Sequence, residues 1–219
     1  MNARFFRCLL SLAAAAVLVG SAALALTIGM GATPAPAATP KGLDRIVLAG
    51  GCFWGMEGVF ERVKGVSDVV AGYSGGSAST AHYELVGTET TGHAEAVEVT
   101  FDPKVISLQR LLDVYFRVAH DPTQVDGQFP DSGPSYRSEI FYANGAQRSV
   151  ARSEIAMLER THAFTKPIAT TVLPLRGFYA AEVYHQHFLD RNPSNPYIVQ
   201  NDLPKIAALH KTFPRLVKR

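Results

Sequence analysis

The chain contains the segment Gly50-Gly51-Cys52-Phe53-Trp54-Gly55, in which one cysteine lies between glycines and two large aromatic residues. The apolar run 45–49 before it is typical of a buried strand. Apolar side chains after it recur at the i, i+3, i+4, i+7 spacing of a helix face: Met56, Val59, Phe60 and Val63. The sequence therefore predicts that Cys52 lies at a turn between a strand and a helix.

A cysteine at a helix N-terminus has a chemical consequence. The free N–H groups and the helix dipole favour the thiolate, so we expect the pKa of Cys52 to fall below the ordinary value of roughly 8.5. The neighbouring rings of Phe53 and Trp54 predict an apolar pocket beside the sulfur. The alternative is that Cys52 is a small buried hydrophobe and that both rings belong to the core.

Composition narrows the class of protein. The chain has 219 residues, is 47% hydrophobic and 18% charged, and carries a net charge of +2, which is ordinary for a globular protein. Since no basic stripe emerges, a nucleic-acid partner is not indicated. The two cysteines are Cys8 and Cys52, and Cys8 lies in an apolar N-terminal segment. If that segment is removed or buried in lipid, Cys52 has no partner for a disulfide.

The first 40 residues have the pattern of a targeting segment. Arg4 and Arg7 precede an apolar run, with small-residue cleavage signatures at 23–25 and 35–37. The run is long enough to span a bilayer, so an uncleaved membrane anchor is the alternative. We therefore expect a signal peptide or anchor plus Ala/Pro linker over 1–40, and one domain over 41–219. The domain would be exported, either periplasmic or anchored outside the cytoplasm.

The segment His93–Phe101 predicts a strand that carries an acid. Strict alternation places Glu95 on the same face as Val97 and Val99. Burial on that face would raise the pKa of Glu95 and keep a proton available near neutral pH. The alternative is that Glu95 reaches solvent at the strand end or pairs with a Lys or Arg.

The remaining pattern predicts the fold class. Further strands are expected over 66–73, 136–142 and 168–173, and helices over 107–120, 146–161, 178–190 and 205–210. Ser107 is the expected N-cap of the 107–120 helix. The loop 123–135 is long enough to be functional or disordered. This irregular alternation predicts an α+β, two-layer sandwich with helices packed on a mixed sheet, in a ferredoxin-like arrangement.

The sequence leaves more than one role open for the histidines and the tyrosines. His185 and His187 are spaced i, i+2, which points helical side chains apart and favours a structural or surface role over a metal site. If His93 or His185 activated Cys52 as a nucleophile for acyl transfer, the protein would be a cysteine hydrolase. Five tyrosines are half-buried packing residues or donors to a substrate oxygen: Tyr73, Tyr83, Tyr136, Tyr179 and Tyr197.

Five motifs in order resemble those of the A-type peptide methionine sulfoxide reductases, over nearly the whole chain from Ile46 to about Leu209. They are Gly51-Cys52-Phe53-Trp54-Gly55, Gly72-Tyr73-Ser74-Gly75-Gly76, Thr91-Gly92-His93-Ala94-Glu95-Ala96 leading to Phe101-Asp102-Pro103, His120-Asp121-Pro122-Thr123-Gln124, and Tyr136-Arg137-Ser138.

The resemblance implies a role for each matched residue. Cys52 would attack the sulfoxide sulfur, and Glu95 would protonate the sulfoxide oxygen. Phe53 and Trp54 would enclose the substrate methyl group. The positions that bind the oxygen or shape the pocket match Tyr83, Asp131, Tyr136 and, in a variable tail, Tyr197. Release of methionine would leave a sulfenic acid on Cys52.

The tail departs from many relatives, which carry recycling cysteines near the C-terminus. Residues 195–199 contain none, so the chain resembles the single-cysteine type. An external thiol, such as a thioredoxin-like protein, would then reduce the sulfenic acid, with no cofactor and no metal. We expect a monomer that repairs oxidised methionine, as the S-sulfoxide, in exported proteins. The alternative is an inactive binding protein of the same fold.

Overall fold

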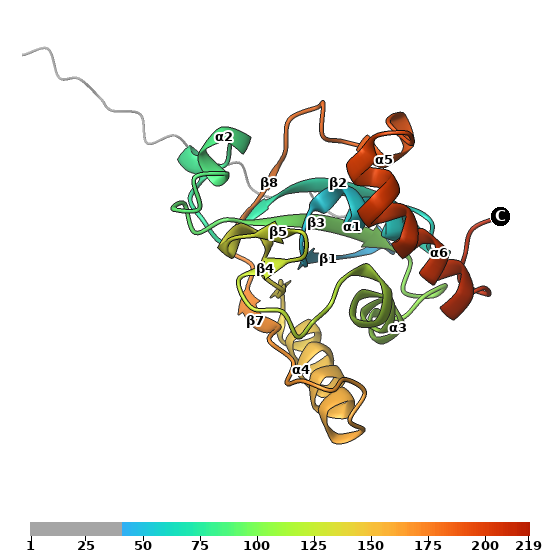
Figure 1. The fold of residues 1–219 in the computed structure, drawn as a ribbon. Helices are drawn as coiled ribbons and strands as arrows, with labels where there is room; N and C mark the ends of the chain where they lie inside the picture. The colour runs from blue at the N-terminus through green and yellow to red at the C-terminus, as the bar shows by residue number, and fades with distance from the viewer. Residues whose placement is uncertain (1–40) are drawn as a thin grey trace, which may run out of the picture. The chain divides into compact units, whose positions relative to one another are not determined.

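A computed structural model describes residues 41–219. The fold of these residues is built on one six-stranded sheet (Figure 1). The strand order is β7-β6-β1-β3-β2-β8. The strands of this sheet are β1 Asp44–Ala49, β2 Val66–Ser74, β3 Ala94–Phe101, β6 Glu139–Tyr142, β7 Thr171–Pro174 and β8 Phe178–Ala180. A separate small hairpin pairs β4 Gly127–Gln128 with β5 Asp131–Ser132.

The topology confirms the predicted α+β class with a mixed sheet. The inner strands β6, β1, β3 and β2 pair antiparallel with one another. Helix α1 (Phe53–Glu61) connects β1 to β2, and α3 (Leu108–Val114) follows β3 on the way to β6. This split βαβ order is that of ferredoxin-like domains. At the edges, β7 pairs parallel with β6, and β8 pairs antiparallel with β2.

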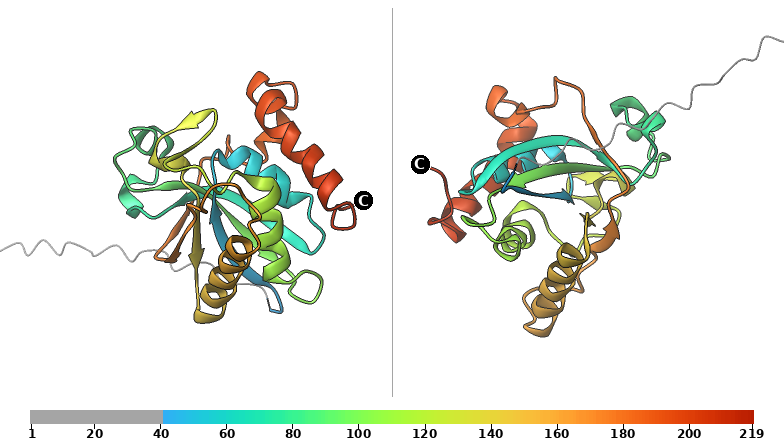
Figure 2. Two further views of the ribbon diagram at one scale, coloured as in Figure 1. Left: turned by 60° about the horizontal axis from the view of Figure 1, so that its bottom comes forward. Right: turned by 180° about the vertical axis from the view of Figure 1, so that it is seen from behind.

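Helices α1, α3, α4 (Gly145–Arg160) and α6 (Leu203–Thr212) contribute to one core on one face of the sheet (Figures 1 and 2). The short α2 (Tyr83–Val86) lies beyond one end of the sheet, and the short α5 (Phe188–Arg191) packs on α1. Two π-helical turns span Tyr115–Ala119 and Ile198–Asp202. The main core joins Met56 and Phe60 of α1 to Val97 and Val99 of β3. Burial of these apolar side chains supplies most of the stabilisation.

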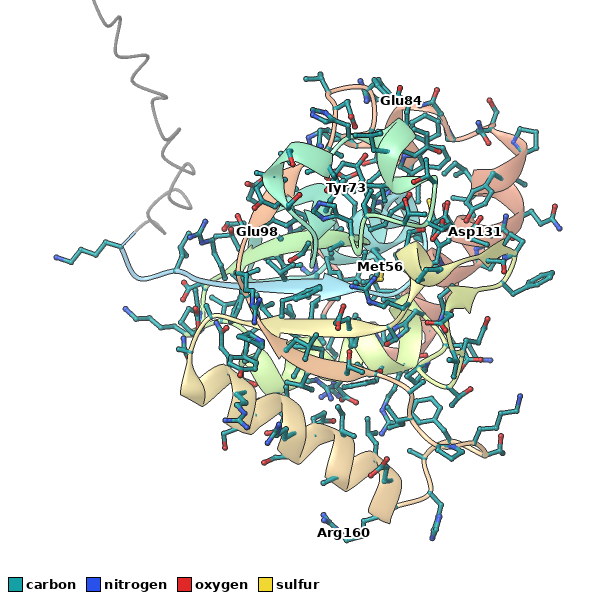
Figure 3. All side chains as sticks on the ribbon, turned by 90° about the vertical axis from the view of Figure 1, so that its left-hand side faces the viewer. Met56, Tyr73, Glu84, Glu98, Asp131 and Arg160 are labelled. Atoms are coloured by element: carbon teal, nitrogen blue, oxygen red, sulfur yellow. The ribbon has the colours of Figure 1, made fainter. Side chains whose placement is uncertain are left out.

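The opposite face of the sheet has a second, smaller core. It contains alanines and larger apolar residues from the inner strands, with Leu175 and Phe178 packed against them: Val47, Ala49, Ala94, Ala96 and Phe141. Since Ala94 and Ala96 lie here while Val97 and Val99 lie in the main core, the alternation predicted for β3 is confirmed. Figure 3 shows Glu84 of α2 and Arg160 of α4 on opposite sides of the molecule, so α4 lies away from the α2 side.

Several predicted elements differ from the structure. The helix predicted over 178–190 is wrong, because this segment forms β8, a series of turns and the short α5. The side chain of Gln186 hydrogen-bonds both the N–H and the carbonyl of Ala71, and these tertiary contacts hold the turns. The strands predicted from 136 and 168 begin only at Glu139 and Thr171.

The other predicted helices are close to those observed. Ser107 is the N-cap of α3, and its hydroxyl accepts a hydrogen bond from Arg110 N. The signal peptide or anchor predicted over 1–40 lies outside the described residues. Within 41–219 the structure has no helix with the length and apolar character needed to cross a bilayer.

Candidate active site

Cys52 occupies the N-cap position of α1, directly after two glycines that follow β1. Gly51 has φ +88°, a conformation that favours glycine. Gly50 needs its small size, because a Cβ there would lie 2.8 Å from the ring of His120. The glycines thus allow the chain to turn tightly from the strand into the helix. The predicted strand-to-helix turn is confirmed, and Cys52 is buried with 8% of its surface exposed.

The eight residues to which the family resemblance gives a role line one pocket of about 220 Å³, which Tyr73 and Tyr179 do not line: Cys52, Phe53, Trp54, Tyr83, Glu95, Asp131, Tyr136 and Tyr197. They come from distant parts of the chain, namely the start of α1, α2, β3, the 127–136 loop and the segment before α6. The loop predicted over 123–135 therefore contributes to the site through Asp131 of β5.

Glu95 is the buried acid of this pocket, with 3% of its surface exposed. Its Oε2 accepts a hydrogen bond of 3.0 Å from the backbone N–H of Phe53. Burial raises the pKa of Glu95 to about 8, against the lowering effect of that hydrogen bond, and the charge of Asp131 adds to the rise. The carboxyl group is therefore mostly protonated at pH 7 and can donate a proton. The alternatives of a solvent-exposed or ion-paired Glu95 are excluded.

The pKa of Cys52 runs against the prediction. Burial raises it well above the ordinary value, and the charges of Glu95 and Asp202 add to the rise. The N–H of Trp54 and the ammonium group of Lys205 lower it by less. The predicted lowering at the helix N-terminus is therefore wrong for the free protein, because the loss of hydration raises the pKa more than these two groups lower it. The resting form is the thiol.

Four aromatic rings, which we call the aromatic wall, lie on one side of the pocket of Cys52: Phe53, Trp54, Phe188 and Tyr197. The indole of Trp54 stacks on Phe188 with ring centroids 3.8 Å apart and planes 10° apart, and Tyr197 meets it edge-on. The Nε1–H of Trp54 donates a hydrogen bond of 3.1 Å to Nδ1 of His185. Phe53 packs against the same imidazole, with centroids 4.9 Å apart. His185 therefore holds the two rings predicted to form the pocket.

Tyrosine hydroxyls supply the polar part of the pocket. Burial, and next the charge of Glu95, raise the pKa values of Tyr83 and Tyr136, so both hydroxyls stay protonated and act as donors. Tyr197 donates its hydroxyl proton to the carboxylate of Asp131. Burial raises the pKa of Asp131, although this hydrogen bond and the charge of Lys205 oppose the rise.

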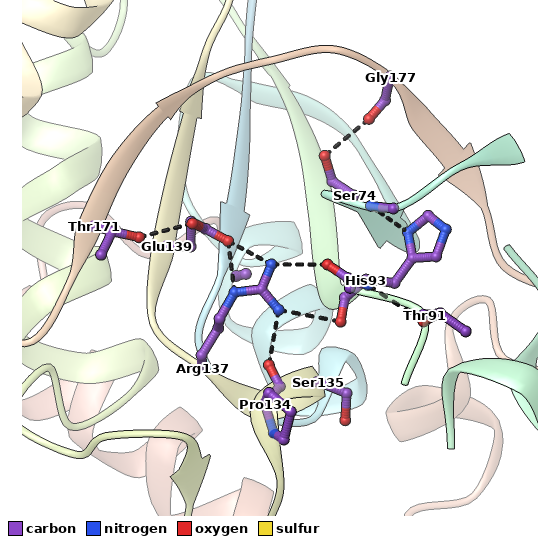
Figure 4. A network of polar contacts seen from close by, with 12 residues as sticks. Ser74, Thr91, His93, Pro134, Ser135, Arg137, Glu139, Thr171 and Gly177 are labelled. Carbon is purple, nitrogen blue, oxygen red and sulfur yellow. Dashed lines mark hydrogen bonds and ion pairs between the residues drawn. The ribbon is translucent and has the colours of Figure 1, made fainter. Parts of the chain in front are cut away.

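Arg137 ties the strand of Glu95 to the loop of Tyr136 (Figure 4). Its guanidinium donates hydrogen bonds to the carbonyls of Gly92 and His93, each 3.1 Å long. It also pairs with the buried carboxylate of Glu139 at 2.7 Å. This network fixes the spacing between the acid and the tyrosine side of the pocket.

Sequence reasoning missed several residues that support the site. Glu182 accepts hydrogen bonds from the hydroxyl of Tyr73 (2.9 Å) and from the N–H of Tyr83 (3.0 Å), which anchors α2. Asp202 is fully buried and pairs with Lys205 at 3.1 Å. The sequence offered one indication for Glu182, which is its place before His185 in an aromatic-rich segment. Because a helix was predicted there, its hydrogen bonds to Tyr73 and Tyr83 were not expected.

The histidines do not form the cysteine–histidine pair of a hydrolase. One ring nitrogen of His93 accepts the N–H of Gly76, and the other bonds the carbonyl of Ser77. His185 is occupied by the Trp54 indole, and its other nitrogen lies 4.0 Å from Glu182. Neither imidazole is placed as a base for Cys52.

Comparison with known proteins agrees with this geometry. A peptide methionine sulfoxide reductase family model matches residues 44–216. The peptide methionine sulfoxide reductase MsrA 2 of Mesorhizobium japonicum is 53% identical over 175 residues, which cover 80% of this chain and 90% of that protein. MsrA 2 of Synechocystis sp. is 46% identical over 180 residues, covering 82% and 84%.

Solved structures give the same result. Methionine sulfoxide reductase A of Corynebacterium diphtheriae has a TM-score of 0.66 at 33% identity, covering 71% of this chain and 78% of that one. Mxr1 of Saccharomyces cerevisiae in reduced form has a TM-score of 0.65 at 35% identity, covering 71% and 89%. Since the family match extends from β1 past α6 and includes every residue that lines the Cys52 pocket, the chain belongs to the peptide methionine sulfoxide reductase family of oxidoreductases.

Proposed function

We propose that the protein reduces the S epimer of methionine sulfoxide in peptides and proteins, with Cys52 as nucleophile and Glu95 as general acid. The observation that carries this proposal is a protonated, buried carboxyl group that lines the same pocket as the only cysteine of residues 41–219. A general acid in that position contributes on the order of 10²- to 10⁴-fold to rate.

The reaction begins with attack of Cys52 Sγ on the sulfoxide sulfur. As the S–O bond weakens, Glu95 protonates the oxygen, while Tyr83 and Tyr136 donate hydrogen bonds to it. The oxygen ends on Cys52 as a sulfenic acid, methionine leaves, and the thiol proton replaces the one that Glu95 gave. The cysteine sulfur is oxidised and the substrate sulfur is reduced.

The sulfenic acid then needs two thiols from outside the domain. The first condenses with it to form a mixed disulfide and releases water, and the second displaces Cys52 as the free thiol. A thioredoxin-like dithiol supplies both. The apolar segment within 1–40 supports export of the domain, and hence repair of oxidised methionine in exported proteins.

A single-turnover experiment tests the proposal. The full-length protein in mild detergent is mixed with an S-epimer methionine sulfoxide peptide without reductant. About one methionine per chain should form, with a sulfenic acid trapped on Cys52, and thioredoxin should restore multiple turnovers. The R epimer and the Cys52→Ser variant are the controls, and neither should yield methionine. Absence of methionine from folded protein with the S epimer would reject the reductase activity.

A further inference from the structure

A second cluster of ligand-type side chains lies further along α1. Glu57 and Glu61 are four residues apart and so share one face of the helix. His187, in the left-handed conformation (φ 53°) just before α5, brings its Nδ1 to 2.5 Å from Glu61 Oε1 and 3.9 Å from Glu57 Oε1. One ligand atom from each residue lies within 4.8 Å of the other two.

Glu57 is the unusual member of this cluster. It is fully buried, and neither carboxylate oxygen has a hydrogen-bond partner among the described residues. The N–H groups of His187 and Phe188 lie close enough to lower its pKa but do not reach hydrogen-bond geometry. A buried carboxylate without a partner is costly, so this group calls for a proton or a cation.

The surroundings give an ion access from solvent. Glu61 and His187 line a surface pocket that also contains Arg62, Asp190 and Lys218. Arg62 forms an ion pair with Asp190 across this pocket. The nearby Arg191 donates its hydrogen bonds to backbone carbonyls, among them that of Tyr184. Among the described residues, the basic group recorded against Glu57 is therefore His187, with its Nδ1 3.9 Å away.

We propose that Glu57, Glu61 and His187 bind one divalent transition-metal ion of the zinc type. One imidazole nitrogen and two carboxylate oxygens are a donor set that such ions accept, with water in the remaining position. Ligand atoms at about 2.0–2.2 Å from zinc lie roughly 3.3–3.6 Å apart in a tetrahedron. Small side-chain rotations convert the present spacing to that one.

The ion would be structural and would take no part in sulfoxide reduction. It would join α1 to the segment before α5, where Phe188, the next residue, stacks on Trp54 of the active-site pocket. The i, i+2 spacing of His185 and His187 disfavours a metal between these two histidines, whereas the present set pairs His187 with two carboxylates of α1.

Calorimetric titration of Zn²⁺ alone into the full-length protein tests the site. Both cysteines are first replaced (Cys8→Ser, Cys52→Ser), because thiolates also bind zinc. We expect one ion per chain and a rise in Tm at saturating Zn²⁺. In this background His187→Ala should weaken binding by at least about tenfold and remove the Tm shift. The matched control His210→Ala, on the exposed side of α6, should leave both unchanged.

Further variants separate loss of the site from loss of the fold. Glu57→Gln should also weaken Zn²⁺ binding, and if this buried variant fails to fold, Glu61→Gln tests the same site at a more accessible position. Circular dichroism without metal verifies the fold of each variant. The proposal is overturned if no ion binds, or if Zn²⁺ binds His187→Ala as tightly as the parent.

Discussion

Two buried carboxyl groups, one on β3 against the start of α1 and one within α1, have different surroundings. Glu95 accepts a hydrogen bond from Phe53 and lines the pocket of Cys52. Glu57 has no hydrogen-bond partner among the described residues and faces Glu61 and His187. Burial raises the pKa of Glu95 to about 8 and that of Glu57 to about 7. A raised pKa alone therefore does not identify a catalytic acid, because the acid must also share a pocket with a nucleophile.

The largest expected effect is on catalysis. Glu95→Gln keeps the shape of the side chain but removes the acidic proton, so the single-turnover rate of methionine formation should fall roughly 10²- to 10⁴-fold. The matched control is Glu98→Gln on the same strand, where Glu98 pairs with Arg45 instead of lining the pocket. A Glu95→Gln variant that retains the parent rate would remove the distinction between the two carboxyl groups.

The next effect is on stability against pH. The pKa of Glu95 rises from 4.5 in its ordinary state to about 8 in the folded protein, so its contribution is fully present below 4.5 and is lost as pH rises through 8. Over that window the free energy of unfolding should fall by up to about 1.4 kcal/mol per pH unit. Urea unfolding of the parent and Glu95→Gln from pH 5 to 9 measures it, and parallel curves would contradict the assignment.

A smaller loss of stability is expected from Gly55→Ala, in the first turn of α1. A Cβ there would lie 2.1 Å from Oδ1 of the buried Asp202, whereas at Gly87 it would meet only ordinary contacts of 3.4 Å or more. The clash should lower the free energy of unfolding by about 1–3 kcal/mol. Gly87→Ala is the control and should be nearly neutral. Equal urea midpoints for both variants would show that the segment of Asp202 shifts to accommodate the new methyl group at little cost.

The smallest effect concerns the aromatic wall. His185→Ala removes the acceptor for the Trp54 indole, so the ring should lose its fixed orientation. We expect KM to rise about five- to tenfold with a smaller change in kcat, in line with roughly 1 kcal/mol for one hydrogen bond. Steady-state kinetics with thioredoxin give both constants, and His210→Ala is the control. A fall confined to kcat would assign His185 to the chemical step instead.

The surroundings of Cys52 and Glu95 could be predicted because they lie in short local patterns, whereas the pocket roles of the three tyrosines and Asp131 came from the family resemblance. The turn at Gly50 and Gly51 follows from glycine, and the inward face of Glu95 follows from the period of a strand. The segment 178–190 could not be predicted in the same way. Its conformation depends on Gln186 bonding the edge strand at Ala71, more than a hundred residues earlier in the sequence.

The order of neighbouring residues was enough to predict the strand-to-helix turn at Cys52, the strand face that carries Glu95 and the α+β class, because each of these is a local property of the chain. Tertiary packing sets the pKa of Cys52, since burial and the charges of Glu95 and Asp202 raise it more than the N–H of Trp54 and the ammonium group of Lys205 lower it. It also decided that His187 meets Glu57 and Glu61. Burial and through-space contact arise from the packing of distant segments, which no local pattern records.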